Sequence, residues 1–293
     1  MSDELDFTGS LKLPPKAAAS APPAPIYIPA IARAFFESSG KEEAFPAGTV
    51  IFAEKEKASR ILLKRDKMYF LIEGEVVLTA HGRSVGRAMP GEIFGEMATL
   101  SDSPRSATAV ARNACRVLSL DDRQFAAALA KQPEFALMML GSMIGRLRGM
   151  IAQLSAVPSA PAEAKETRVF DRSMMASLAN GLGDRATVRY QRGSVIMVAG
   201  QAGALMYVVS EGRVAISLRG ALVERIGPGG VFGEMALVDR SPRAASALAE
   251  TDCVLLAINR VVFLNLVKAD PTFGISLLGA MAARLRNTAG ALN

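Results

Sequence analysis

One stretch of the sequence occurs twice, and its residues suit the binding of an anionic sugar. Residues 90–98 read PGEIFGEMA and residues 228–236 read PGGVFGEMA, and in each copy an arginine follows nine residues after the Glu. Backbone N–H groups at the start of a helix attract an anion, and an arginine holds a phosphate with two hydrogen bonds. The carboxylate instead suits a hydroxyl such as a ribose 2′-OH. The stretch therefore predicts a pocket for a singly charged sugar phosphate.

Both copies resemble the phosphate-binding cassette of cyclic nucleotide-binding domains, the family of bacterial catabolite activators and protein kinase A regulatory subunits. The family pattern is F-G-E-[LIM]-A-L, a short gap, and P-R-[AST]-A-[ST]. The first copy reads FGEMATL and then SPRSAT, and the second reads FGEMALV and then SPRAAS. A single F-G-E is a weak signal, but two copies in register identify the chain as a member of this family.

The resemblance implies a role for each residue of the two cassettes. The arginines would bind the ligand phosphate, the glutamates would bind the ribose 2′-OH, the glycines would let the backbone approach the ligand, and the Met and Ala residues would present N–H groups. Other roles stay open: a glutamate also suits a helix N-terminus, the methionines also suit a core, and an arginine after a proline is often a surface residue. The candidate ligand-binding residues are Gly95, Glu96, Met97, Ala98, Arg105, Ser106 and Ala107 in the first copy, and Gly233, Glu234, Met235, Ala236, Arg243, Ala244 and Ala245 in the second.

The residue after each cassette arginine differs between the copies. It is Ser106 in the first copy and Ala244 in the second. In the family, a hydroxyl at this position is linked with tolerance of guanine, and alanine with cyclic AMP. The resemblance thus implies cyclic AMP for the second copy and leaves cyclic AMP or cyclic GMP open for the first.

Each copy also departs from the family in the loop that precedes its Met-Tyr strand. The family often has an aspartate there that orients the cassette arginine. The first copy keeps Asp66 but lacks the usual glycine pair, whereas the second keeps Gly200 and Gly203 but has Ala204 in place of the aspartate. An arginine without its orienting carboxylate is less preorganised, so we expect weaker binding where the carboxylate is missing.

The elements around the cassettes are predicted to be short strands flanked by helices. Many short strands followed by terminal helices favour a mainly β fold, with two jelly-roll-like β-rolls in tandem. Each has a helical lead-in and C-terminal helices. The predicted strands include 49–52, 68–72, 76–80 and the alternating stretch 106–120, and then 188–190, 195–198, 206–210 and 214–218; the predicted helices are 26–39, 121–129, 133–154, 170–178, 260–267 and 272–286.

An internal repeat defines the domain organisation. Residues 68–148 match 206–286 with a constant offset of 138, and further upstream the offset becomes 145, so the first copy has seven extra residues between Phe52 and Met68. We expect a disordered Pro/Ala-rich tail at 1–25, one binding domain at 26–157, a linker at 158–165, and a second binding domain at 166–293.

The composition argues against several classes of function. The 293 residues carry a net charge of +6, but the Lys and Arg are scattered, which favours a solvated surface over a nucleic-acid site. No apolar run is long enough to span a membrane, and the start lacks the order of a signal peptide, so we expect a cytoplasmic protein. Cys115 and Cys253 occupy matching positions and are expected to be buried thiols, and His81 is the only histidine, which argues against a metal site.

The signalling output is expected to lie in another protein. We expect no DNA-binding domain, kinase pseudosubstrate or enzymatic site in this sequence, and no cofactor beyond the cyclic nucleotide ligand. The C-terminal helices are expected to cap the ligand, to form a homo-oligomer, or to pack in the core. We expect a cyclic nucleotide sensor that binds its ligand in one or both β-rolls and signals to an unidentified effector protein by rearrangement of its helices. The alternatives are a regulatory-subunit-like partner of a kinase or other enzyme, a scaffold with degenerate pockets, and pockets for a cyclic dinucleotide or a nucleoside.

Overall fold

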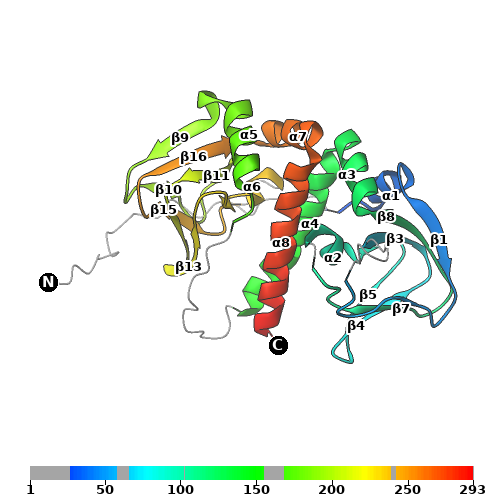
Figure 1. The fold of residues 1–293 in the computed structure, drawn as a ribbon. Coiled ribbons are helices and arrows are strands. Elements are labelled where there is room, and N and C mark those ends of the chain that lie inside the picture. Colours follow the sequence, from blue (N-terminus) through cyan, green and yellow to red (C-terminus); the bar gives the residue numbers. More distant parts are fainter. Residues whose placement is uncertain (1–26, 58–65, 102, 155–167, 239–241, 293) are drawn as a thin grey trace.

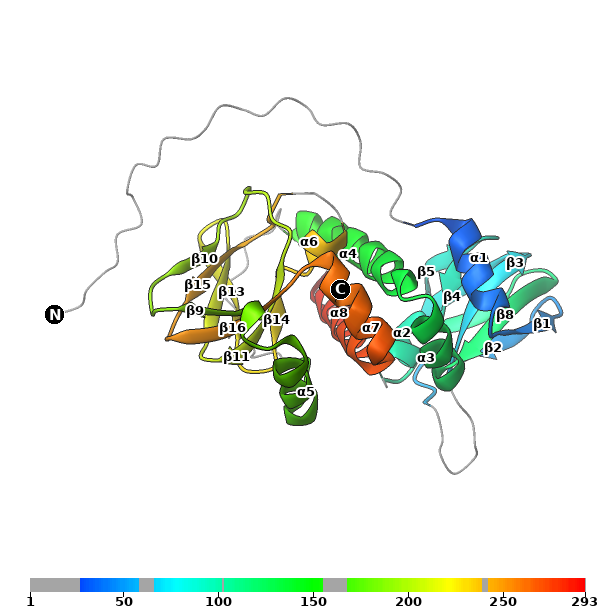
Figure 2. The same cartoon turned by 90° about the horizontal axis from the view of Figure 1, so that it is seen from above.

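The computed structural model describes residues 27–57, 66–101, 103–154, 168–238 and 242–292 (Figure 1). The predicted tail at 1–25 and the predicted linker at 158–165 lie outside the described residues, as does most of the predicted insertion. Two β-rolls lie on either side of a central layer of helices (Figures 1 and 2).

The first β-roll consists of two four-stranded antiparallel sheets, in the orders β1-β8-β3-β6 and β2-β7-β4-β5. Stacked rings of Phe52, Tyr69 and Phe94 lie in the core between the sheets. The elements of this domain are α1 (Pro29–Glu37), β1 (Lys41–Phe45), β2 (Val50–Phe52), β3 (Lys67–Glu73), β4 (Val76–Ala80), β5 (Arg83–Ala88), β6 (Ile93–Phe94), α2 (Glu96–Ser101), β7 (Thr108–Ala111), β8 (Cys115–Asp121), α3 (Asp122–Lys131) and α4 (Glu134–Leu154).

The second domain repeats this architecture, with sheets in the orders β14-β11-β16-β9 and β10-β15-β12-β13. The prediction of two tandem β-rolls with flanking helices is therefore confirmed. Its elements are α5 (Arg172–Leu182), the short 3-10 helix η1 (Asp184–Ala186), β9 (Thr187–Tyr190), β10 (Val195–Met197), β11 (Met206–Glu211), β12 (Val214–Leu218), β13 (Ala221–Ile226), β14 (Val231–Phe232), α6 (Met235–Val238), β15 (Ser246–Ala249), β16 (Cys253–Ile258), α7 (Arg260–Ala269) and α8 (Pro271–Leu292).

Local sequence explains several element boundaries. Asp121 caps α3 through a reciprocal pair of hydrogen bonds with Gln124, which satisfies two backbone N–H groups at the helix start. His81 and Gly82 both have positive φ, 52° and 75°, and two such residues form the tight turn that matches the twist of a hairpin. That turn makes β5 the partner of β4.

The C-terminal helices join the two domains. Helices α4 and α8 pack against each other between the β-rolls, and α8 also packs on α2 of the first domain (Figure 1). In each domain a lead-in phenylalanine stacks on one from the C-terminal helices, Phe35 on Phe135 and Phe170 on Phe273. One cluster of buried apolar residues runs through all these helices, so the two domains share a core.

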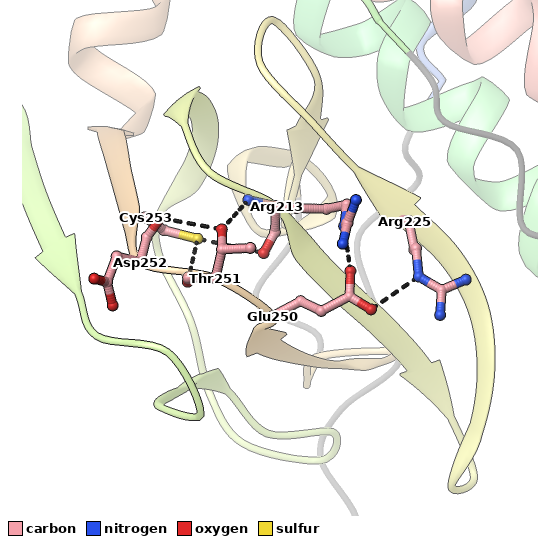
Figure 3. A network of polar contacts seen from close by, with 6 residues as sticks. All are labelled: Arg213, Arg225, Glu250, Thr251, Asp252 and Cys253. Atoms are coloured by element: carbon pink, nitrogen blue, oxygen red, sulfur yellow. Dashed lines mark hydrogen bonds and ion pairs between the residues drawn. The ribbon is translucent and has the colours of Figure 1, made fainter.

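Each domain has an ion pair at the same two positions of the repeat, but the positive and negative residues are exchanged between the domains. In the first domain Glu75 pairs with Arg112, whereas in the second domain Arg213 occupies the position of Glu75 and pairs with Glu250. Arg225 also pairs with Glu250, at 2.9 Å (Figure 3). The exchange keeps the attraction between the two positions, as expected for repeats that diverged with the same fold.

The cysteines lie beside this pair of positions. Cys115 and Cys253 are both free and buried. The thiol of Cys115 contacts the backbone carbonyl of Glu75, and the thiol of Cys253 contacts that of Arg213 at the matching position (Figure 3). The prediction of two buried thiols is confirmed.

No single helix within the described ranges is both long and apolar enough to span a membrane. The bent pair α7–α8, with 114° between its helices, meets the length and composition criteria when taken together. The cytoplasmic location stays a prediction.

Candidate functional site

The first cassette turns sharply from strand β6 into helix α2. Gly95 makes this turn with a φ of +76°, a conformation that glycine adopts without steric cost. A Cβ atom added here would lie 3.0 Å from the guanidinium of Arg105 and 3.1 Å from the ring of Phe52. Glycine is therefore needed both for the backbone angle and for the approach of the arginine.

Arg105 is buried and held on several sides. Its guanidinium donates to the carbonyls of Gly95 and Lys67, at 2.7 and 2.8 Å, and lies 3.4 Å from a carboxylate oxygen of Asp66. Its charged end also lies 4.2 Å from the ring centroid of Phe52. Burial lowers the pKa of Arg105, and the carboxylate of Asp66 opposes that shift. The expected orienting role of Asp66 matches this geometry.

Glu96 is buried at the N-terminus of α2 and faces the C-terminal helix of its own domain. Its carboxylate accepts a hydrogen bond of 2.8 Å from Arg146 of α4, whose side chain is 54% exposed. The carboxylate is thus held in place by an arginine whose own side chain is about half exposed to solvent. A ligand hydroxyl that approached Glu96 would share it with Arg146 or displace that residue.

A cavity of about 570 Å³ opens beside this cassette. All seven residues predicted for the first copy line it, from Gly95 to Ala98 and from Arg105 to Ala107. Further lining residues come from the lead-in segment, from strand β5 and from α4, one of the helices for which capping of the ligand was an expected role: Tyr27, Val85, Gly86, Arg87, Met139, Ser142, Met143 and Arg146. The hydroxyl of Tyr27 donates to the carbonyl of Gly91 at 2.8 Å, which fixes this ring at the rim of the cavity.

In the second cassette the arginine has fewer partners. Gly233 has a φ of +73°, and its carbonyl accepts a hydrogen bond of 3.0 Å from Arg243. Within the described residues, which leave out 239–241, no carboxylate forms an ion pair with Arg243, in keeping with Ala204 at the position of Asp66. Burial lowers the pKa of Arg243, with Tyr207 and Glu234 opposing the shift.

Gly203 leaves space for the side chain of Arg243, the arginine of the second cassette. A Cβ atom added at Gly203 would lie 2.2 Å from Nε of Arg243, so the side chain of Arg243 lies directly on the backbone of this loop. The glycine that the second copy retains is therefore needed for space, not for an unusual backbone angle.

Glu234 is held more tightly than its counterpart. Arg284 of α8 donates to Glu234 at 2.9 Å and to Glu224 of β13 at 3.3 Å, and only 18% of its side chain is exposed. Burial lowers the pKa of Arg284, but the two carboxylates outweigh that effect and the pKa is raised. Glu224 replaces Gly86 of the first domain, so the second site contains one more carboxylate.

A cavity of about 400 Å³ lies beside the second cassette. Of the residues predicted for the second copy, Gly233, Glu234, Met235, Arg243, Ala244 and Ala245 line it. Ala236 belongs to α6, and its side chain lies outside the described part. The cavity is also lined by Leu147, which comes from α4 of the first domain.

Sequence reasoning missed the arginines that contact the cassette glutamates, although a signal was present. Arg146-Leu147-Arg148 and Arg284-Leu285-Arg286 are identical triplets in the repeat, and charged residues repeated on an otherwise apolar helix indicate a specific partner. No signal pointed to Glu224 or Tyr27, since both are brought to the site only by the fold. Over the described residues, no group of three or more His, Cys, Asp or Glu side chains is placed to hold a metal ion.

Comparisons with known proteins find relatives of both domains. The family model of the cyclic nucleotide-binding domain matches residues 42–132 and 187–270. The cAMP-dependent protein kinase regulatory subunit of Eremothecium gossypii is 29% identical over 203 residues, which are 69% of this chain and 40% of that protein. The cyclic AMP receptor protein of Thermus thermophilus is 37% identical over 102 residues, which are 33% of this chain and 47% of that protein. The chain thus spans less than half the length of either relative.

Among solved structures, the regulatory domain of Toxoplasma gondii protein kinase A in a co-crystal with cAMP is 23% identical, with 86% of each chain covered and a TM-score of 0.30. That TM-score is too low for the likeness to carry an argument. The two matches to the family model span more than half of the chain and contain both cassettes. The chain therefore belongs to the cyclic nucleotide-binding domain family and contains this domain twice.

Proposed function

We propose that the protein is a sensor that binds a 3′,5′-cyclic nucleotide in each of its two cavities. The observation that carries this proposal is that a glycine turn, a buried glutamate at a helix start and an arginine, buried in the first domain and half-buried in the second, line one cavity in each domain. We assign these tasks to two binding domains at 26–157 and 166–293. The matches at 42–132 and 187–270 lie inside these boundaries.

Each part of a cyclic nucleotide has a complementary group in the site. The backbone N–H groups at the start of α2 or α6 and the guanidinium of Arg105 or Arg243 would bind the phosphate. Glu96 or Glu234 would accept a hydrogen bond from the ribose 2′-OH. The base would lie against the apolar lining, which includes Val85 in the first cavity and Val223 in the second.

The two sites are proposed to differ in base preference. Ser106 lines the first cavity with a hydroxyl, whereas Ala244 lines the second without one. A hydroxyl in this position can donate to or accept from a purine edge. We assign cyclic AMP to the second site, and cyclic AMP or cyclic GMP to the first.

The protein is proposed to act on a separate effector rather than to catalyse a reaction. Ligand binding can shift a conformational equilibrium only if the two states differ in affinity for the ligand. The contacts of Arg146 and Arg284 with the cassette glutamates offer such a difference, because the ribose hydroxyl would compete for the same carboxylates. The movement of α4 and α8 would then carry the signal.

A second candidate is a regulatory partner of a protein kinase. It is favoured by the similarity to fungal kinase regulatory subunits, which extends over 69% of this chain. A pull-down with and without cyclic AMP, followed by identification of the captured protein, tests this candidate. Capture of a kinase that cyclic AMP releases would support it, and retention of no kinase under either condition would count against it.

The test of ligand binding is calorimetric titration of the purified chain with cyclic AMP and cyclic GMP. The same titrations are made on Arg105→Ala and Arg243→Ala, with Arg33→Ala as a control, because Arg33 is exposed on α1, where it pairs with Glu37. We expect two binding events, one of which is lost in each cassette variant, and no change in the control. Flat titrations with both nucleotides would refute the sensor and favour a scaffold with degenerate pockets or another ligand, such as a cyclic dinucleotide or a nucleoside.

A further inference from the structure

Helix α8 of the second domain faces both binding sites. Residues two apart on an α-helix point about 200° apart, so alternate side chains reach opposite sides. Arg284 points to its own domain and donates to Glu234 at 2.9 Å. Arg286 points the other way, to helix α2 of the first domain.

Arg286 contacts the first cassette at three points. Its guanidinium donates to Ser101 Oγ at 2.5 Å, to the carbonyl of Met97 at 3.3 Å and to Ser103 Oγ at 3.0 Å. Met97 lies in the first turn of α2, and Ser103 lies two residues before Arg105. One side chain from the second domain thus joins the cassette helix to the loop that leads into the phosphate-binding arginine.

The backbone of α8 supports this contact. A Cβ atom added at Gly279 would lie 2.6 Å from the carbonyl oxygen of Leu100 in α2, so the two helices approach more closely than a larger residue permits. Leu285, between the two arginines, is buried in the shared core. The position of Arg286 relative to α2 is therefore set by packing and not only by its hydrogen bonds.

The first domain contributes to the second site in turn. Leu147 of α4 lines the second cavity together with Phe232 and Ile226. In the repeat, Leu147 and Leu285 are equivalent, as are Arg148 and Arg286. Each domain thus extends its C-terminal helix to the cassette side of the other.

We propose that Arg286 is a positioning residue of the first binding site, supplied by the second domain. It holds α2 and the loop before Arg105 in the geometry that a cyclic nucleotide requires, so that the first site reaches full affinity only with α8 in place. The proposal rests on ligand binding at the first site as proposed above. Preorganisation of this kind raises affinity because the ordering cost is met before the ligand arrives.

The experiment uses the full chain with Arg243→Ala, so that only the first site is titrated with cyclic AMP. Adding Arg286→Gln is expected to weaken binding about tenfold, and Arg286→Lys to weaken it less, since lysine keeps the charge but cannot span all three acceptors. Arg33→Gln, the same change of charge on an exposed side chain, is expected to change affinity by less than about twofold.

A double-mutant cycle separates positioning from general loss of structure. If Arg286 acts through the serine hydroxyls, then Ser101→Ala with Ser103→Ala weakens binding on its own, and adding Arg286→Gln weakens it little further. In the Arg105→Ala background only the second site is titrated. There, Arg286→Gln is expected to change the affinity for cyclic AMP by less than about twofold. Additive losses, or equal losses at both sites, would overturn the assignment.

Hydrogen exchange of the ligand-free chain supplies a readout that does not depend on binding. Arg286→Gln is expected to speed exchange at the amides of α2 more than at those of α6. If the Arg243→Ala chain binds no cyclic nucleotide, the proposed function fails at the first site, and exchange alone then decides whether Arg286 orders the cassette. If that chain binds but Arg286→Gln changes neither affinity nor exchange, the inference is wrong and the proposed function stands.

Discussion

Replacement of Asp66 by asparagine tests how the first site holds Arg105, the arginine proposed to bind the phosphate. The carboxylate of Asp66 lies 3.4 Å from the guanidinium of Arg105, and the two side chains are 13% and 5% exposed. Asparagine keeps the shape of the side chain and removes its charge. Two effects then oppose each other: Arg105 loses an orienting partner, but the bound phosphate also loses a nearby negative charge.

The size of the effect follows from the distance and the burial. At 3.4 Å and an effective dielectric constant of about 20, the attraction between the two charges is about 5 kcal/mol. Most of this offsets the cost of burying both groups, which leaves about 1.4 kcal/mol, or a factor of about ten in affinity. The carbonyls of Gly95 and Lys67 still hold the guanidinium, so binding is weakened and not abolished.

The second site permits the reverse change. Ala204→Asp places a carboxylate at the position of Asp66, next to the loop on which Arg243 lies. We expect the affinity of the second site for cyclic AMP to rise several-fold, since the guanidinium of Arg243 has a single hydrogen bond, to the carbonyl of Gly233, within the described residues. Ala204→Asn is the matched control without the charge.

Both changes are measured by calorimetry in backgrounds that leave one site active, Arg243→Ala for the first site and Arg105→Ala for the second. Weaker binding by Asp66→Asn and tighter binding by Ala204→Asp are the expected pair of results. If Asp66→Asn binds cyclic AMP more tightly, repulsion of the phosphate outweighs orientation of Arg105, and the reasoning is refuted.

Three further changes test the stability of the fold. Arg284→Ala leaves the buried Glu234 and the half-buried Glu224 without their arginine partner, so urea unfolding should show a loss of about 2–3 kcal/mol, against about 1 kcal/mol or less for Arg146→Ala; equal losses would contradict this. Burial raises the pKa of Glu43, but hydrogen bonds from Lys67 and Ser119 outweigh this effect, so the pKa lies below its ordinary value of 4.5. The stability that this carboxylate contributes is complete above the unfolded pKa and is lost as the pH falls through the folded pKa, so Glu43→Gln should flatten the acid side of a plot of unfolding free energy against pH, and an unchanged slope would count against it. Glu250→Arg should lower the free energy of unfolding by about 1–2 kcal/mol, because it places a third arginine beside Arg213 and Arg225. Adding Arg213→Glu reproduces the arrangement of the first domain and should restore most of this loss. If urea unfolding shows no recovery, the exchanged pairs are not equivalent.

The cassettes could be predicted from the sequence because their chemistry is local. The glycine turn, the glutamate and the arginine of each copy lie within eleven consecutive residues, so short-range geometry brings them together. Every residue predicted for the first copy lines one cavity. The capping of α3 by Asp121 and the turn at His81-Gly82 were predictable for the same reason.

Strands β1 and β5 were not predicted, because their side chains carry little pattern. Most side chains of Arg83–Ala88 are exposed, and only Ala88 is buried, so the alternation that indicates a strand is weak. Strand β1 likewise has no buried residue. Strand β1 pairs with β8 and β5 pairs with β4 through backbone hydrogen bonds, to which most residue types contribute equally.

The contacts between the domains could not be predicted from the sequence either. Leu147 and Arg286 lie on helices whose apolar stripes fit capping, oligomerisation or core packing equally well. The choice among these depends on how the two domains pack, which involves residues more than a hundred positions apart. The structure shows core packing that also brings Leu147 to the cavity of the second domain and Arg286 to helix α2 of the first domain.

The most direct test of the account is a crystal structure of the chain grown with cyclic AMP. The account predicts ligand density in both cavities, with the phosphate at hydrogen-bond distance from Arg105 and Arg243 and the ribose hydroxyl on Glu96 and Glu234. Empty cavities at saturating ligand, or a ligand whose phosphate lies away from both arginines, would contradict it.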